Sequence, residues 1–312
     1  MPDLKALLPR RLRLFLRNIR HLWSLDLHRL LWQITAMEKS IRGISGFALQ
    51  NGPVAATLFP IPHPHAEINK HEFRIYSQNG EDGILLWLFS KIGTTSRTFI
   101  EFGMGTGREC ISTNLILNFG WRGLLMDGSP ENVSDAKLFF KLLMPWEECA
   151  QLDIHRQFIT KDNINTILAS RKHMAQPDLL AIDIDGNDYW VWEKVTVVDP
   201  RVVVIEYNST YGWEEAISSV YKPSFNTYQE DGIGLYHGAS LAAFVKLGAQ
   251  KGYACIGCDS NGANTFFVKK ELLGDISTVS PKQAFYENQH KLKRGSREVQ
   301  FARIKDKPYA RV

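Results

Sequence analysis

Three aspartates crowd the end of an apolar run in LLAIDIDGNDYW, residues 179–190, and their types and spacing suit chemistry. Asp183 and Asp185 are two residues apart, so on a strand both side chains would share one face. Because burying an unpaired charge is costly, a buried strand that ends in acids indicates a use for them: a metal, a proton or a cofactor hydroxyl. The third acid, Asp188, is expected to cap a helix that begins at Tyr189.

A glycine-rich loop occurs earlier, in FIEFGMGTGREC, where it follows a predicted strand and precedes a predicted helix. Glycines allow the sharp turn and the close approach to a ligand that such a loop needs. The dinucleotide pattern G-x-G-x-x-G requires glycine or alanine where this chain has Arg108, which disfavours NAD. The next strand ends in Asp127, whose carboxylate would accept both hydroxyls of a ribose; alternatively, it only begins the turn DGSP. The loop residues of interest are Glu101, Gly103, Gly105 and Gly107.

The elements that must position these residues alternate between strands and helices from about residue 72. Because strands that alternate with helices pair in parallel, the pattern predicts an α/β fold with a doubly wound, mostly parallel sheet. Near the end, two apolar runs flank Asn261 and Gly262, which predicts an antiparallel hairpin over 253–270. We expect strands at 97–103, 122–128, 177–186 and 201–208, and helices at 108–120, 129–143, 163–172, 187–195 and 238–252.

The two ends of the chain are basic, whereas the body between them is acidic. Residues 1–50 are expected to form a basic amphipathic helical extension, 51–71 a proline-rich linker, 72–272 the main domain and 273–312 a basic C-terminal extension. The acidic body argues against a nucleic-acid partner. The first helix, over residues 1–30, could lie on an anionic membrane surface, or it could pack on its own domain or on another subunit of a homo-oligomer; both interpretations stay open.

Composition sets the class of protein. With 312 residues, 44% of them apolar and 22% charged, the chain can bury a globular core. No apolar run reaches the roughly 18 residues that span a bilayer, and arginines interrupt the first apolar stretches, so we expect neither a transmembrane helix nor a secretory signal. Four cysteines are too few for a disulfide scaffold, which favours a reducing compartment, and the isolated pair Cys255 and Cys258 does not predict a zinc site.

Four stretches carry a resemblance to a known family. They are YSQNGEDGIL (76–85), FIEFGMGTGRECISTNLILNFGWRGLLMDGSPENV (99–133), DLLAIDIDGNDYWVWE (178–193) and VVVIEYNS (202–209). Together they resemble the FkbM-type branch of S-adenosylmethionine-dependent methyltransferases and its relatives in surface-polysaccharide gene clusters, over about residues 72–270. The fold of that family is a class I, Rossmann-like seven-stranded sheet whose last strand is antiparallel, and the predicted hairpin would supply this strand.

The resemblance implies S-adenosylmethionine as the cofactor. By position, Asp127 would hold its ribose, and Asp183 would face both its methyl group and the acceptor. Gln78 and Glu81, in SQNGED, would close over the same pocket; alternatively, this segment only forms a turn and the start of a helix. The full cofactor-binding set that the resemblance implies is Gln78, Glu81, Glu101, Gly103, Gly105, Gly107, Asp127 and Asp183.

The resemblance also implies a divalent cation or a base. Several O-methyltransferases of this class bind a magnesium-like ion at the ends of the fourth and fifth strands, and oxygen ligands suit such a hard cation. The implied ligands are Asp183, Asp185, Glu206 and Asn208. A sugar hydroxyl is a poor nucleophile until a cation acidifies it or a base takes its proton. The candidate catalytic residues are Asp183, Asp185 and His237. His237 is the candidate base and His155 a weaker one; alternatively, His237 is only structural. The family often has D-x-E-G where this chain has D-I-D-G, so Asp185 is one methylene shorter.

The expected function is methyl transfer to a hydroxyl of a glycan, glycolipid or nucleotide sugar. The enzyme would be cytoplasmic, and peripheral at the inner face of the membrane if residues 1–30 bind there. Two alternatives stay open: a non-catalytic methyltransferase-fold module in polysaccharide assembly and, less favoured, an NAD-dependent enzyme. Trp190 and Trp192 are two apart on a predicted helix, so either one of them lines an acceptor pocket or both rings pack in the core.

Overall fold

The computed structural model describes residues 64–171 and 174–312 of the chain. The predicted helical extension over 1–50 and most of the predicted linker over 51–71 lie outside these residues. In the part of the chain that the structure describes, no helix combines the length and the apolar character that a membrane crossing requires.

The end of the predicted linker belongs to the packed body. It forms the 3-10 helix η2 (Glu67–His71), in which Ile68 is fully buried. The Asn69 side chain donates a hydrogen bond of 2.8 Å to the carbonyl of Cys258, at the end of a strand of the main sheet. The predicted domain boundary therefore lies several residues too late in the chain.

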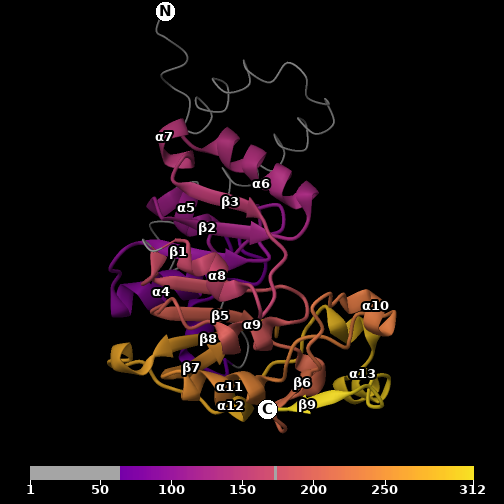
Figure 1. Ribbon diagram of the computed structural model, residues 1–312. Helices are drawn as coiled ribbons and strands as arrows, with labels where there is room; N and C mark the ends of the chain where they lie inside the picture. The colour runs from indigo at the N-terminus through magenta and orange to yellow at the C-terminus, as the bar shows by residue number, and fades with distance from the viewer. Residues whose placement is uncertain (1–63, 172–173) are drawn as a thin grey trace, which may run out of the picture.

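Seven strands form one sheet in the order β3-β2-β1-β4-β5-β8-β7 (Figure 1). The strands from β1 to β5 are parallel to one another, whereas β8 is antiparallel to both of its neighbours. This confirms the predicted doubly wound, mostly parallel sheet with an antiparallel last strand, and the predicted hairpin is β7 and β8. The strands are β1 (Thr98–Phe102), β2 (Arg122–Asp127), β3 (Leu152–Arg156), β4 (Leu179–Ile182), β5 (Val202–Glu206), β7 (Tyr253–Cys258) and β8 (Asn264–Lys269).

Helices cover both faces of the sheet because the inner strands are apolar on both faces. On β1, Phe99 packs in the core shared with α4, α5 and α6, and the next residue, Ile100, packs in the core shared with α8, α9 and α11. The helices are α4 (Glu81–Ile92), α5 (Thr113–Phe119), α6 (Pro130–Leu143), α7 (Trp146–Cys149), α8 (Ile164–Ala169), α9 (Asp188–Lys194), α11 (Leu241–Gln250) and α12 (Pro281–Ala284).

The C-terminal segment, expected as an extension outside the domain, folds back onto the body. Strand β9 pairs antiparallel with β6, and α13 contacts η4, which follows β5. Figure 1 shows β6, β9, α10 and α13 together, on the side toward which the parallel strands point. Phe225, Tyr236 and Ile304 belong to the apolar cluster of this region. These elements are η4 (Ser209–Tyr211), β6 (Ile217–Ser219), α10 (Thr227–Asp231), η5 (Lys270–Leu272), η6 (Lys291–Arg294), α13 (Arg297–Ala302) and β9 (Tyr309–Arg311).

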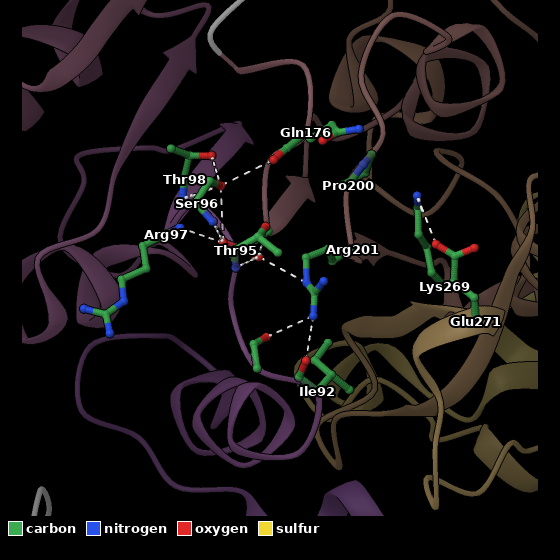
Figure 2. A network of polar contacts seen from close by, with 12 residues as sticks. Ile92, Thr95, Ser96, Arg97, Thr98, Gln176, Pro200, Arg201, Lys269 and Glu271 are labelled. Carbon is green, nitrogen blue, oxygen red and sulfur yellow. Dashed lines mark hydrogen bonds and ion pairs between the residues drawn. The ribbon is translucent and has the colours of Figure 1, made fainter.

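The amino end of β4 is held by a buried aspartate, Asp178. Its carboxylate accepts hydrogen bonds from the backbone N–H groups of Thr95, Ser96 and Arg97, at 2.9, 2.9 and 2.6 Å. Arg201 forms an ion pair with it at 3.2 Å. Figure 2 shows the Arg201 guanidinium between the turn at Thr95 and the end of α4, where it also donates to a backbone carbonyl. The loop between α4 and β1 is therefore fixed to the sheet by one side chain.

Candidate functional site

A cleft of about 510 Å³ lies at the edge of the sheet where the parallel strands end. A smaller cavity of about 120 Å³ adjoins it and shares part of its wall. In doubly wound folds this edge is where ligands bind. The residues common to both cavities are Gln78, Gly103, Gly105 and Asp183, and the cleft is further lined by Met126, Asp127, Gly128, Asn132, Gln157, Phe158, Ile159, Ile184, Asp185, Asn187, Glu206 and Phe225.

The glycines of the loop after β1 have different surroundings. Gly103 has φ +77°, and a Cβ there would lie 1.5 Å from the carbonyl oxygen of Asp183, so the loop touches the end of β4. Gly105 has φ +54°, and a Cβ there would meet no atom within 4 Å. Gly107 lies against α6, where a Cβ would come 2.9 Å from Phe140, and it lines neither cavity. The expected cofactor contact therefore fits Gly105 and does not fit Gly107, which packs the loop onto α6.

Glu101 shapes the same loop from inside. Its carboxylate is buried and accepts hydrogen bonds from the backbone N–H groups of Ile111 and Ser112, at 2.8 and 3.0 Å, and from the Ser112 hydroxyl. Burial raises the pKa of Glu101, and these hydrogen bonds oppose the increase. The side chain thereby ties the end of β1 to the start of α5, and it also lines the smaller cavity.

Asp127 ends β2 and faces the cleft. One carboxylate oxygen accepts the backbone N–H of Gly105 at 2.9 Å. The other accepts the backbone N–H of Ser129 at 2.8 Å and the side-chain amide of Asn132 at 3.1 Å. Since each carboxylate oxygen has two acceptor sites, Asp127 keeps capacity for further donors while it joins the glycine loop to the start of α6.

Gln78 and Glu81 lie in the segment that leads into α4. Gln78 lines both cavities, and Glu81 lines the smaller one. Glu81 is also the first residue of α4, and it accepts hydrogen bonds from the backbone N–H of Asn79 at 2.7 Å and the side-chain amide of Asn264 at 2.8 Å. The pocket interpretation and the helix-start interpretation therefore describe the same segment.

The ends of β4 and β5 bring three acids together. Ligand oxygens of Asp183, Asp185 and Glu206 lie within 4.8 Å of one another. Burial, and then the charge of Glu206, raises the pKa of Asp183 well above its usual range. Burial and the charge of Asp185 raise the pKa of Glu206 to about 8. Desolvation in the cleft raises the pKa of Asp185, against the opposing charge of Lys291. We call Asp183, Asp185 and Glu206 the acid cluster.

The backbone of the acid cluster is itself unusual. Asp185 has φ +55°, a conformation that costs energy in a residue other than glycine and is often found at functional sites. Asp188 holds this turn, because its carboxylate accepts the backbone N–H groups of Ile184 at 2.8 Å and Gly186 at 2.9 Å. The prediction that Asp188 caps a helix is wrong: it is the first residue of α9, Asn187 is the N-cap residue, and Asp188 points back to the turn.

Two predicted site residues have other contacts. Asn208 is fully buried; its amide donates to the carbonyls of Leu235 and His237, and its oxygen accepts the backbone N–H of Thr210. The expected role of Asn208 as a metal ligand therefore does not fit, because both ends of the amide are engaged. His237 is also buried and lines neither cavity, so its expected role as the base does not fit its position either.

Lys291 is a residue beside the site that sequence reasoning missed, although it lines neither cavity. Its amine lies 2.8 Å from His237 Nε2 and 3.1 Å from Asn208 Oδ1. It belongs to η6, in the segment that was assigned to a C-terminal extension. A lysine among nine basic residues in the last forty gives no signal of its own, because only the return of the chain brings it to the end of β5.

The aromatic residues of the cleft are also different from those expected. Trp192 is buried in the core, and Trp190 donates from Nε1 to the carbonyl of Ser219 at 2.9 Å. Neither ring lines the cleft, so the core interpretation holds for Trp192. The cleft has Phe158, after β3, and Phe225, before α10, as its aromatic rings.

Comparisons with known proteins give fold-level likenesses only. No family model and no curated protein matches the chain. An O-methyltransferase from Bacillus cereus in complex with SAH is 16% identical, over 71% of this chain and 90% of its own, with a TM-score of 0.40. The N-terminal domain of EvdMO1 with SAH bound is 12% identical, over 69% and 93%, with a TM-score of 0.39. Magnesium protoporphyrin IX methyltransferase (ChlM) from Synechocystis PCC 6803 with bound SAM is 13% identical, over 61% and 78%, with a TM-score of 0.38.

At such identities and TM-scores these likenesses carry no argument about activity. The strand order of this chain rests on its own pairing, and the antiparallel last strand is the one that the resemblance implied. The narrower resemblance, to the FkbM-type branch and to polysaccharide gene clusters, stays a prediction.

Proposed function

We propose that this protein transfers a methyl group from S-adenosylmethionine to an oxygen of a small acceptor. The observation on which the proposal depends is the contact between Gly105 and Asp127 in the wall of the cleft. The backbone of Gly105 donates to Asp127 at 2.9 Å, and the space beside its Cα is open. A glycine that leaves room for a ligand beside an acid that can accept ribose hydroxyls is an arrangement suited to a nucleoside.

The shape of the site supports a donor with two chemically different ends. Beside Asp127 the cleft has Phe158 and Ile159, apolar side chains against which a purine ring can pack. In the other direction the shared wall leads to the smaller cavity, which is lined by Gln78 and Glu81. We place the methionine portion there, so that the donor methyl group lies near Asp183.

The acid cluster supports proton removal from the acceptor. As the acceptor oxygen attacks the methyl carbon, a C–O bond forms, the C–S bond breaks, and its electron pair stays on sulfur. The hydroxyl proton passes to a carboxylate of the cluster, and Glu206 suits this role because its pKa is about 8, close to neutral pH. Positioning the acceptor in line with the sulfonium supplies much of the rate.

We propose a sugar hydroxyl as the acceptor. The family resemblance supports this choice, and so does a cleft that is lined by carboxylates and by the ring of Phe225. Contact with the inner face of a membrane through residues 1–30 is a prediction from charge pattern, and it concerns residues outside those that the structure describes. The proposed reaction uses no divalent cation.

The test is mass spectrometry of acceptor panels incubated with the full-length protein and S-adenosylmethionine. We expect one sugar-containing acceptor to gain a CH₂ unit, with release of S-adenosylhomocysteine, and we expect Asp183→Asn to abolish both signals. The matched control is Asp275→Asn, at an exposed acid that pairs with Lys91 and lines neither cavity. Donor binding without turnover on any acceptor would favour the non-catalytic module, and binding of NADH instead of the donor would favour the nicotinamide enzyme.

A further inference from the structure

Lys291 is fixed at both its backbone and its side chain. The backbone N–H of Lys291 donates to the side chain of Asn288 at 3.1 Å, and its carbonyl accepts the side-chain amide of Gln300 at 3.0 Å. Gln300 is buried, and it in turn accepts the hydroxyl of Thr210, which follows β5, at 2.9 Å. The C-terminal segment therefore holds this lysine at a defined place beside the end of β5.

The amine of Lys291 has two acceptors, and one of them, His237, lies beside Glu206 of the acid cluster. His237 Nε2 lies 2.8 Å from it and Asn208 Oδ1 lies 3.1 Å from it. Burial and the charges of Lys291 and Arg294 keep the pKa of His237 well below its usual range, so the imidazole is neutral and Nε2 accepts. The other ring nitrogen, Nδ1, then bears the proton and lies 3.8 Å from Glu206 Oε2. Lys291 thus contacts His237, and His237 in turn lies beside Glu206 of the acid cluster.

Charge explains why a lysine is stable there. Three carboxylates within 4.8 Å of one another repel, and the repulsion costs most at Asp183 and Glu206, which are partly buried, whereas Asp185 is exposed. Burial lowers the pKa of the Lys291 amine, whereas Glu206, Asp185 and Asp183 favour its charged form. The positive charge of Lys291 therefore offsets part of the repulsion among the three acids, and the rest of that repulsion contributes to their raised pKa values.

The same contacts disagree with the implied metal site. A cation held by the four implied ligands needs the oxygen of Asn208, which accepts from Thr210 and from Lys291 instead. It would also have to approach the ammonium group of Lys291. Three carboxylates attract a cation by charge, but the ammonium group of Lys291 already supplies a positive charge there.

We propose that Lys291 is the resident cation of the acid cluster and takes the place of a divalent metal in this protein. Lys291 is then a positioning residue, which acts on Asp183, Asp185 and Glu206 through its charge and on Glu206 also through His237. The C-terminal segment then supplies a charge to the acid cluster, although Lys291 itself lines neither cavity. The proposal rests on the proposed methyl transfer only for its catalytic meaning, and its test needs no turnover.

The experiment is a calorimetric titration of the full-length protein with Mn²⁺, which serves as the probe for a hard divalent cation. We expect no saturable binding to the wild type. Lys291→Met keeps the length of the side chain and removes its charge, so it should bind one Mn²⁺ at least about tenfold more tightly than the wild type, because the positive charge that repels the ion is gone. Lys291→Arg keeps the charge and should behave like the wild type.

Two further variants locate the effect. Lys293→Met removes a charge from an exposed position of the same helix, η6, and should leave Mn²⁺ binding unchanged. Lys291→Met combined with Asp183→Asn should lose the gained affinity, which would place the ion at the acid cluster. Circular dichroism and thermal melting report whether each variant is folded.

Tight, stoichiometric Mn²⁺ binding by the wild type would overturn the proposal, and so would a folded Lys291→Met protein with no gain in affinity. Neither result bears on donor binding, which is measured separately with S-adenosylmethionine. A failure of the donor titration would count against the proposed function and leave the cation assignment standing.

Discussion

The two ends of β4 carry aspartates in opposite situations. Asp178, before the strand, is fully buried and is saturated by three backbone N–H groups and Arg201. Asp183, after the strand, lies five residues later beside two other acids and lines both cavities. One strand of four residues therefore separates a carboxylate whose partners are complete from one whose pKa is raised by burial and by like charge.

The two aspartates separate the acids that stabilise this fold from those that are available for chemistry. An acid with complete partners lowers the free energy of the folded state, and its loss leaves buried donors unpaired. An acid among like charges raises the free energy of the folded state, and such an arrangement persists where a function requires it. The amino edge of the sheet is accordingly the structural edge, and the carboxyl edge is the candidate site.

The largest expected effect comes from neutralising the two aspartates in parallel. Asp178→Asn should lower the free energy of unfolding by about 3–5 kcal/mol, because it leaves the partly buried charge of Arg201 without its partner and weakens the buried acceptor of three backbone N–H groups. Asp183→Asn should leave that free energy unchanged or raise it, because it removes one of three repelling acids. Urea unfolding measures both, and an equal loss of stability in the two variants would abolish the comparison.

Two glycine variants extend the comparison within the carboxyl edge of the sheet. Gly103→Ala should destabilise the protein by about 3 kcal/mol, since it combines left-handed strain with a Cβ that collides with the backbone of β4. Gly105→Ala meets open space and should cost only about 1 kcal/mol of strain. The two variants should separate in the other measurement, because the new methyl group of Gly105→Ala would project into the cleft and weaken donor binding. A Gly105→Ala protein with unaltered donor affinity would remove this residue from the site.

The pH dependence of stability should show that ionisation of Glu206 is unfavourable in the folded protein. Its pKa is about 8 in the folded protein, above the ordinary glutamate value of 4.5, so the folded state holds a proton that the unfolded state has released. Stability from this group is complete below pH 4.5 and is lost as the pH rises toward 8. The melting temperature of Glu206→Gln relative to the wild type should therefore increase between these pH values. A difference in melting temperature that does not change with pH would show that the pKa of Glu206 is not raised.

Sequence reasoning predicted the sheet better than its edges. The apolar runs of β1, β2, β4 and β5 and the hairpin of β7 and β8 were recognisable because both faces of those strands are buried. Strand β3 was not predicted, because His155 and Arg156 make its end polar and exposed. Strands β6 and β9 were not predicted either, since each is three residues long and neither forms without the other.

The candidate site divides in the same way. Asp127 ends its strand, and Gly105 and the two acids after β4 follow theirs within three residues, so their place in the chain predicts their place in space. The contacts of Lys291 could not be predicted, because they depend on a turn of the C-terminal segment that no local pattern encodes. The role of Asp188 could not be predicted for a related reason: a helix cap and a clamp on the preceding turn have the same sequence spacing.

The binding of S-adenosylmethionine itself is the most direct test of a nucleoside site at the carboxyl edge. Titration calorimetry on the full-length protein should show one donor per chain. Asp127→Asn should lose most of that affinity, because an amide cannot accept two ribose hydroxyls while it keeps the bond from Gly105. The exposed control, Asp275→Asn, should bind as the wild type does. A wild-type protein that gives no binding heat and no competition by S-adenosylhomocysteine, or an Asp127→Asn protein that binds the donor as tightly as the wild type, would contradict the account.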